Sequence, residues 1–306
     1  MTPEGATLEF LTNLGILQGD VLAPLIFIIV LDFILRLSVS STDGIKIGNI
    51  TLADLEFADD IATVTDSLLK NTQLCQKIAD TAARFGLMFN ISKTKFMFFN
   101  ITRPLHPEDR VAVNGEFLEE VNDFKYIGSY VRSSPKAILV RKALAWKALQ
   151  TLDVFWKSHM SRRIKIKIFR TAVEPVLLYG SETWTLNKSD IRGLDGVYTR
   201  MLRRVLDVSW KSHTTNAVLY GATPKLTTTI KQRRLRFAGH VHRNDQQPVQ
   251  HLLFWTPSYG KRYQGRPHTV YHQVLCEDTG LGPEELRRAM EDRDEWKAVC
   301  RRLVDP

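Results

Sequence analysis

The pattern of apolar residues changes near residue 130, and this change limits the chain to a mixed architecture. Before it, short apolar runs flank turn signals such as Gly48-Asn49 and Asn114-Gly115, which are typical of β-hairpins. After it, apolar residues recur at helical spacing, which predicts helices at 164–179, 191–206, 227–242 and 283–303. We therefore predict an α+β fold, with a mainly antiparallel sheet and helices first and a mainly helical region second.

Further local signals fill in this outline. The apolar run 21–37 contains Pro24 and Asp32 and is shorter than the ~20 residues that cross a bilayer, so a buried helix is expected and no membrane partner. Ser67 and Gly86 are expected to cap a helix, and Ser134-Pro135 to begin one. Segments 95–99 and 123–131 are predicted strands, and 244–268 a long loop.

Charge divides at the same place. Residues 1–130 hold 10 Lys and Arg against 17 Asp and Glu, a net charge of −7, whereas residues 131–306 hold 32 against 16, a net charge of +16. An acidic part followed by a basic part suggests carboxylate chemistry in the first and nucleic-acid binding in the second. A solvated basic surface is the alternative.

Three cysteines are too few for a disulfide framework, and their odd number indicates reduced thiols in an intracellular protein. The N-terminal residues lack the basic and apolar regions of a secretion signal. An intracellular, non-secreted location is therefore expected, and the oligomeric state is left open.

The sharpest chemical feature is the tetrapeptide Phe57-Ala58-Asp59-Asp60, read as a hairpin with its turn at Asp59-Asp60. Adjacent carboxylates between apolar strands repel each other unless a cation is present. Magnesium-dependent phosphoryl transfer requires carboxylates held on rigid strands. Taken alone, the tetrapeptide is better explained as an Asp-rich solvent turn, because Asp favours turns.

Four segments in order strengthen the functional interpretation: GILQGDVLAPLIF (15–27), FADD (57–60), GLMFNISKTK (86–95) and FKYIGS (124–129). This set resembles the palm of reverse transcriptases of non-LTR (LINE-type) retrotransposons. Later segments, among them VRKALAWKAL, VLLYGSETWTL and RRLRFAGHVHR, resemble the thumb and C-terminal region of the same elements. The resemblance implies a partial palm at 1–130, a helical thumb-like region at 131–210 and a basic helical C-terminal region at 211–306.

The resemblance also implies roles for single residues. Asp59 would be a direct magnesium ligand, and Asp60 a weaker ligand or a support for the turn. Lys93 would act on the pyrophosphate leaving group, and a surface lysine beside Lys95 is the alternative. Gln18 and Gly19 would contact template or nucleotide, and Tyr126 and Gly128 would form the primer grip. The implied reaction is RNA-templated addition of deoxynucleoside triphosphates to a DNA primer with two Mg²⁺ ions.

One element of that site is missing from this sequence. The family places another metal-binding aspartate upstream of the Gln-Gly segment, but the fourteen residues before Gly15 contain none. Loss of one ligand disrupts a two-metal clamp. We therefore expect a truncated polymerase that is inactive by itself, so that its enzymatic activity is left open. Three alternatives remain: a non-catalytic nucleic-acid-binding remnant, an incomplete gene model and a degenerate copy.

The basic part supplies the candidate nucleic-acid contacts. Arginines and lysines stand close in sequence to aromatic residues, a combination that suits phosphate pairing and base stacking. The candidates are Arg203, Arg204, Arg233, Arg234, Arg236, Lys261, Arg262 and Arg266. Nuclear localisation fits this ancestry. Trp146, Trp156 and Trp184 are expected in helix cores. His268, His272 and Cys276 could share a helix face, but their spacing does not match a zinc knuckle, so zinc is not expected.

Overall fold

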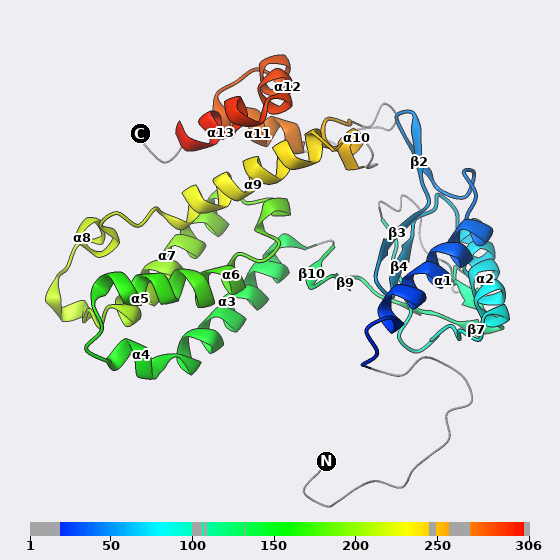
Figure 1. Ribbon diagram of the computed structural model, residues 1–306, viewed down its shortest axis with the longest axis horizontal. Helices are drawn as coiled ribbons and strands as arrows, with labels where there is room; N and C mark the ends of the chain where they lie inside the picture. Colours follow the sequence, from blue (N-terminus) through cyan, green and yellow to red (C-terminus); the bar gives the residue numbers. More distant parts are fainter. Residues whose placement is uncertain are drawn as a thin grey trace, which may run out of the picture. The chain divides into compact units, whose positions relative to one another are not determined.

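A computed structural model describes residues 19–99, 106, 109–131, 133–244, 249–256 and 270–302. The chain divides into two compact units. The first comprises residues 1–46 and 51–120, and the second comprises residues 47–50 and 121–306. Helices and small two-stranded sheets make up the described parts, as an α+β fold requires (Figure 1).

Two helices and short strand pairs form the first part of the chain. The helices are α1 (Ala23–Ser38) and α2 (Leu68–Arg84). The strands are β1 (Ile45–Ile47), β2 (Ile50–Leu52), β3 (Asp54–Phe57), β4 (Asp60–Thr63), β5 (Lys95–Phe96), β6 (Ala112–Val113), β7 (Glu116–Phe117) and β8 (Glu119–Glu120). β3 pairs antiparallel with β4, β6 pairs antiparallel with β7, and β5 pairs parallel with β8.

Local signals explain several of these bounds. Ser67 precedes α2, and Gly86 follows it with a φ of +73°, in the left-handed conformation that glycine adopts readily. Asn114 and Gly115 both have positive φ between β6 and β7, as a type I′ hairpin turn needs. The predicted hairpins and the helix between Ser67 and Gly86 are confirmed, although the Ser67 side chain makes no capping hydrogen bond. The strand predicted at 95–99 is confirmed only for Lys95 and Phe96.

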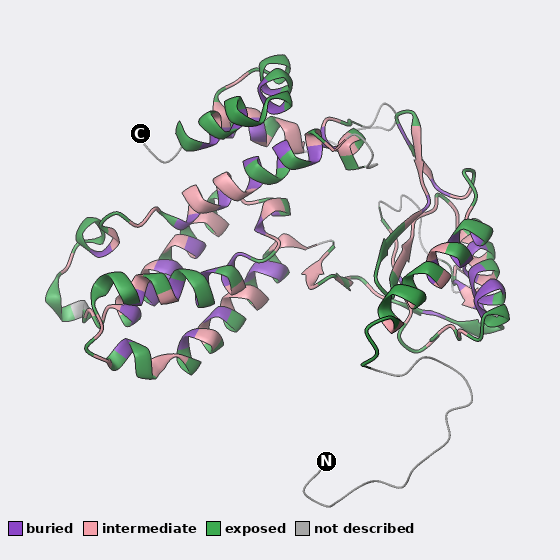
Figure 2. Cartoon of the chain, viewed as in Figure 1, coloured by how far each residue is buried: buried purple, intermediate pink, exposed green. Residues whose placement is uncertain are grey.

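The burial predicted for α1 is only partly correct. Its C-terminal half packs against α2, where Leu31 and Leu35 meet Leu74 and Ile78. Its N-terminal half has little cover. The exposed large apolar residues of 21–37 are Val21, Leu22, Leu25, Ile26, Ile28, Ile29, Phe33 and Leu37. Figure 2 shows this exposed stretch in green. The helix exists as predicted, but only the part beside α2 is buried.

The second unit continues with one strand pair and a series of helices. β9 (Lys125–Tyr126) and β10 (Ser129–Tyr130) form an antiparallel hairpin where the sequence predicted one strand, because Ile127 and Gly128 make the turn. The longer helices are α3 (Ser134–Thr151), α7 (Lys188–Val205), α9 (Leu226–His242) and α13 (Arg293–Arg302). Shorter helices are α4 (Asp153–Lys157), α5 (Arg162–Ile168), α6 (Glu174–Leu177), α8 (Asn216–Tyr220), α10 (Val249–Leu253), α11 (Tyr271–Thr279) and α12 (Pro283–Glu291), with 3-10 turns η2 (Ser181–Thr183) and η3 (Trp210–Ser212).

Two predicted helices are interrupted. The helix expected at 164–179 passes through a π-helical turn, η1 (Phe169–Val173), just before Pro175, which has no amide hydrogen to continue the ladder. The helix expected at 283–303 stops at Asp292, whose carboxylate accepts hydrogen bonds from the amides of Asp294 and Glu295 and so begins α13.

Two apolar cores hold the second unit together, and α9 contributes to both. Leu226 and Ile230 lie in a core with residues of α3 to α8, including Trp156 and Trp184 as predicted. Leu235, Ala238 and Val241 lie in a core with α10 to α13. Trp146 packs against the first core. The two halves of α9 therefore belong to different cores.

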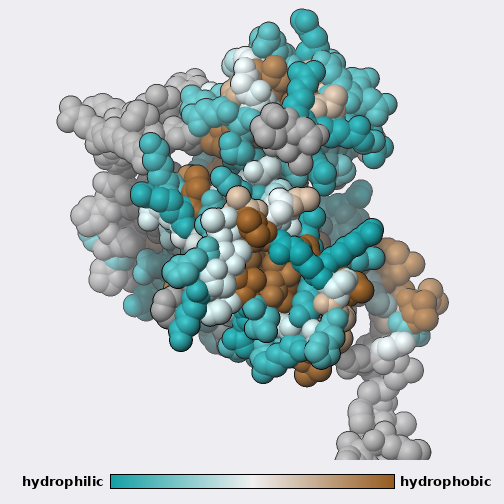
Figure 3. All heavy atoms as spheres, turned by 90° about the vertical axis from the view of Figure 1, so that its left-hand side faces the viewer, coloured by the Kyte–Doolittle hydropathy of each residue, from teal (hydrophilic) through white to brown (hydrophobic). Residues whose placement is uncertain are grey.

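Hydrophilic and hydrophobic side chains both reach the surface of this unit (Figure 3). Figure 3 looks onto its α4–α5–α8 end, where hydrophobic side chains gather among hydrophilic ones. Val154, Phe155, Ile164 and Val218 are exposed on these three helices. Each helix within the described residues is too short or too polar to span a bilayer.

Candidate functional site

The Asp59-Asp60 pair lies on a tight hairpin between β3 and β4. Phe57 pairs with Asp60, so the two-residue loop is Ala58-Asp59, and the turn predicted at Asp59-Asp60 is displaced by one residue. Ala58 has a φ of 54°, which a non-glycine residue rarely adopts, so the loop is strained. Both aspartates are exposed. The loop thus presents two adjacent carboxylates to solvent on a short, paired support.

The two faces of this hairpin differ. Ile61 packs against the α1–α2 core, and its cross-strand partner is Glu56. Since side chains alternate along a strand, Phe57 and Asp60 lie on the opposite face, away from the helices. Phe57 is 58% exposed there. Asp60 therefore stands on an open surface beside an exposed aromatic ring.

A second group of carboxylates lies on the helix-facing side. Desolvation, together with a hydrogen bond and repulsion from Asp54, raises the pKa of Glu56 to about 7. Asp32 of α1 adds to this effect, whereas Arg36, which pairs with Asp32 at 2.8 Å, opposes it. The hairpin thus concentrates negative charge on both of its faces.

The fit of this hairpin to Mg²⁺ is partial. Mg²⁺ prefers oxygen ligands and is usually held by one or two carboxylates together with substrate phosphates. Asp59 and Asp60 can supply such carboxylates. Among the described residues, no group of three or more His, Cys, Asp or Glu is placed to hold a metal ion. A complete site therefore needs further oxygen ligands beyond this pair.

The other predicted residues of the first unit are placed as follows. Gln18 lies outside the described residues, and Gly19 has a φ of +100° just before α1. Lys93 is exposed on a turn, where its backbone amide donates a hydrogen bond to Oδ1 of Asn90 at 3.1 Å. Lys95, two residues on, forms an ion pair with Glu119 at 2.5 Å. Lys93 is thus the more accessible of the two lysines.

The predicted primer-grip residues lie on the β9–β10 hairpin. Ile127 and Gly128 turn the chain with φ values of 46° and 74°. Tyr126 is half-buried and lines a pocket of about 330 Å³. The other lining residues are Ser129, Tyr130, Val131, Ser134, Thr183, Trp184 and Thr185. This part of the chain places aromatic rings and hydroxyls around a small cavity.

The predicted nucleic-acid-binding arginines differ in accessibility. Arg204 pairs with Asp153 at the surface, with 2.8 Å between nitrogen and oxygen, and Arg203 donates to the carbonyl of Thr214 at 2.7 Å. Arg233 is half-buried beside Glu182, whereas Arg236 is exposed. Lys261, Arg262 and Arg266 lie outside the described residues. Arg236 and the partly exposed Arg203 and Arg204 are therefore the accessible members of the set.

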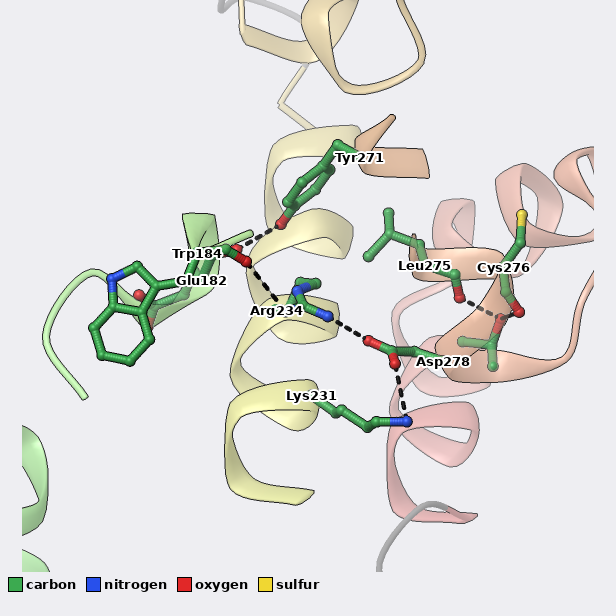
Figure 4. A network of polar contacts seen from close by, with 9 residues as sticks. Glu182, Trp184, Lys231, Arg234, Tyr271, Leu275, Cys276 and Asp278 are labelled. Atoms are coloured by element: carbon green, nitrogen blue, oxygen red, sulfur yellow. Dashed lines mark hydrogen bonds and ion pairs between the residues drawn. The ribbon is translucent and has the colours of Figure 1, made fainter. Parts of the chain in front are cut away.

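Arg234 has a structural role in this fold. Its side chain is 7% exposed and pairs with the equally buried Asp278 at 2.7 Å. Lys231 holds the other carboxylate oxygen at 3.0 Å, and the carbonyl of Trp184 accepts a second hydrogen bond from Arg234. Figure 4 shows these contacts joining α9, α11 and the η2 segment. The guanidinium is thus engaged inside the protein and is not presented to solvent.

Of the residues weighed as zinc ligands, His272 has a buried ring nitrogen. Nδ1 of His272 is buried and has no hydrogen-bond partner among the described residues. Burial lowers the pKa of His272, and Phe254 packs between His272 and His242. His268, which the sequence places four residues before His272, lies outside the described residues.

Comparison with known proteins defines the class to which this hairpin belongs. Residues 3–131 match the family described as reverse transcriptase (RNA-dependent DNA polymerase). The matched segment spans the FADD hairpin and the other three segments of the palm resemblance. This part of the chain is therefore similar to the reverse transcriptases.

The relatives indicate reverse transcriptases of non-LTR retrotransposons in particular. The chain is 24% identical over 273 residues to an uncharacterized transposon-derived protein of Caenorhabditis elegans, a match that covers 84% of this chain and 98% of that protein. It is 22% identical to the RNA-directed DNA polymerase from mobile element jockey of Drosophila funebris, over 71% of this chain and 24% of the relative. It is 26% identical to a Pol polyprotein from the type-1 retrotransposable element R2 of Popillia japonica, over 71% of this chain and 31% of the relative. No solved structure matches the chain significantly.

Proposed function

We propose that this chain carries the metal-binding hairpin and nucleic-acid-contacting helices of an RNA-directed DNA polymerase, and that by itself it binds primer–template without extending it. The observation that carries the proposal is the tight hairpin that presents Asp59 and Asp60 within the segment that matches reverse transcriptases. The chain spans about a quarter to a third of the two polymerase relatives.

Each residue of the proposed site has a physical task. Asp59 and Asp60 would hold Mg²⁺, which when bound activates the primer hydroxyl and neutralises charge on the phosphates. Lys93 is exposed and can stabilise the charge of a leaving pyrophosphate. Gly19 lets a nucleotide approach the backbone closely. In the second unit, Tyr126 and Gly128 would contact the primer, and Arg203, Arg204 and Arg236 would neutralise phosphates.

The lack of extension follows from the number of carboxylates. A two-metal site clamps both the attacking and the leaving oxygen, and two adjacent aspartates cannot supply all of its ligands. The 306-residue chain should therefore bind and not polymerise.

A primer-extension assay with an RNA template, a DNA primer, deoxynucleotides and Mg²⁺ tests this proposal. We expect a stable complex with primer–template and no incorporation. Incorporation that Asp59→Ala abolishes would refute the lack of activity but keep the polymerase assignment. Failure of the wild-type chain to bind primer–template would refute the proposal as a whole.

The alternative is a non-catalytic nucleic-acid-binding protein, favoured by the net charge of +16 in residues 131–306. Both functions predict that affinity falls steeply with salt, because bound cationic side chains release counterions. They differ in Mg²⁺ dependence. If Mg²⁺ strengthens primer–template binding by the wild-type protein but not by Asp59→Asn, the β3–β4 hairpin binds the metal ion. If Mg²⁺ has the same effect on both proteins, the alternative is favoured.

A further inference from the structure

The turn of the β9–β10 hairpin adopts an unfavourable backbone conformation. Ile127 has a φ of 46°, and the left-handed region is strained for a β-branched residue because its Cβ approaches the backbone. Such outliers persist only where surrounding contacts hold them, and they gather at functional sites. Contacts from other elements are therefore needed to hold this turn.

Two side chains from the helical part of the same unit bind the turn carbonyls. The hydroxyl of Tyr179, which follows α6, donates to the carbonyl of Ile127 at 2.8 Å. The guanidinium of Arg141, from α3, donates to the carbonyl of Gly128. The Arg141 guanidinium also lies 4.1 Å from the centre of the Tyr179 ring, so the two donors support each other.

The glycines of this region make the approach possible. A Cβ on Gly128 would lie 3.1 Å from Arg141 and 3.2 Å from the Tyr179 ring. A Cβ on Gly180 would lie 3.4 Å from the Ser129 hydroxyl. Gly180 also has a φ of 72°, which turns the chain directly after Tyr179. The absence of side chains at these two glycines therefore lets the β9–β10 hairpin pack closely against the Arg141 and Tyr179 side chains.

We propose that Arg141 and Tyr179 are positioning residues that hold the β9–β10 hairpin in the geometry that binds the recessed 3′ end of a primer. The inference rests on the proposed function, because it takes Tyr126 and Gly128 as the primer-contacting residues. The two donors fix both carbonyls of the turn, so the residues on either side keep one orientation before nucleic acid arrives. Preorganisation of this kind reduces the ordering cost of binding.

The test uses the full chain and two probes: an RNA–DNA duplex with a recessed primer 3′ end, and a blunt duplex of the same sequence. Tyr179→Phe removes one hydroxyl without changing charge. We expect it to weaken the recessed-end complex by about fivefold, the value of one typical hydrogen bond, and to leave blunt-duplex affinity unchanged. Backbone amides of the turn should also exchange faster.

Arg141→Gln should produce the same selective loss. A uniform loss on both probes would instead indicate a lost phosphate contact. Because both residues hold one turn, the double variant should lose less than the product of the single effects. Tyr220→Phe, which removes a hydroxyl bonded to Thr199 at 2.9 Å, and Arg162→Gln, which removes a donor to the carbonyl of Val218 at 3.2 Å, are matched controls.

The outcomes separate the inference from the proposed function. Faster exchange at the turn with unchanged preference for the recessed end would mean that the two residues only stabilise the fold, and would overturn the positioning role. Unchanged exchange and unchanged preference would overturn it as well. If the wild-type chain shows no preference for a recessed end, the assignment of the primer grip fails and the inference fails with it.

Discussion

The buried Arg234–Asp278 ion pair makes the second unit sensitive to the loss of one carboxylate. Asp278→Asn removes the negative charge and leaves the Arg234 guanidinium, 7% exposed, without a counter-charge. Removal of one partner from a buried pair typically costs about 3–5 kcal/mol, because the remaining charge stays desolvated. With a urea dependence of about 1–3 kcal/mol per molar, the unfolding midpoint should fall by about 1–5 M.

Tryptophan fluorescence is the appropriate assay because all six tryptophans of the chain lie in the second unit. Urea unfolding followed by this signal therefore reports the second unit alone. Asp153→Asn is the control, since it disrupts the surface pair with Arg204 and should leave the midpoint nearly unchanged. Replacing Arg234 and Asp278 together by leucines should recover stability relative to Asp278→Asn.

An Asp278→Asn midpoint equal to that of wild type would refute this reasoning. It would mean that rearrangement of the Arg234 guanidinium toward water offsets the loss of the carboxylate.

Three further predictions concern the β3–β4 hairpin and two glycines in helices. The pKa of Glu56 is raised to about 7 in the folded state, so the folded protein binds its proton more tightly than the unfolded chain. As pH rises from about 4.5 to about 7, the first unit should therefore lose stability. Hydrogen exchange of the α2 amides measures this loss, and Glu56→Gln should remove it. In α9, a Cβ on Gly239 would lie 2.2 Å from the Trp296 indole nitrogen, so Gly239→Ala should destabilise the second unit by about 1–3 kcal/mol. Gly196→Ala, in α7 with open space around it, should stabilise by about 0.5–1 kcal/mol in the same urea experiment, and a loss of stability there would show that the added methyl group meets a neighbour.

The sequence predicted elements best where the signal is local. The Asn114-Gly115 turn and the start of α2 after Ser67 depend on a few adjacent residues, and both appear as expected. The exposed half of α1 was not predictable in this way. Its composition indicates an apolar environment, but the identity of its neighbours depends on tertiary contacts, and only the half beside α2 is covered.

The candidate sites show the same limit. The FADD tetrapeptide could be found by its residues, although the position of its turn was wrong by one residue. The role of Arg234 could not be found, because its partner Asp278 stands 44 residues later with no motif to join them. Arg141 and Tyr179 were likewise missed, since their hydrogen bonds run to backbone carbonyls that any sequence would provide.

Because α9 contributes to two apolar cores, the helices that follow it cannot be removed without affecting the rest of the second unit. Leu226 and Ile230 near its start are needed by the helices before it, and Leu235 to Val241 by the helices after it. A deletion that removes α11 to α13 would leave the later apolar stripe of α9 in water, while a deletion that includes α9 would open the earlier core. The C-terminal helices are therefore not a detachable module, and recombination or truncation near residue 226 should be tolerated poorly within this lineage.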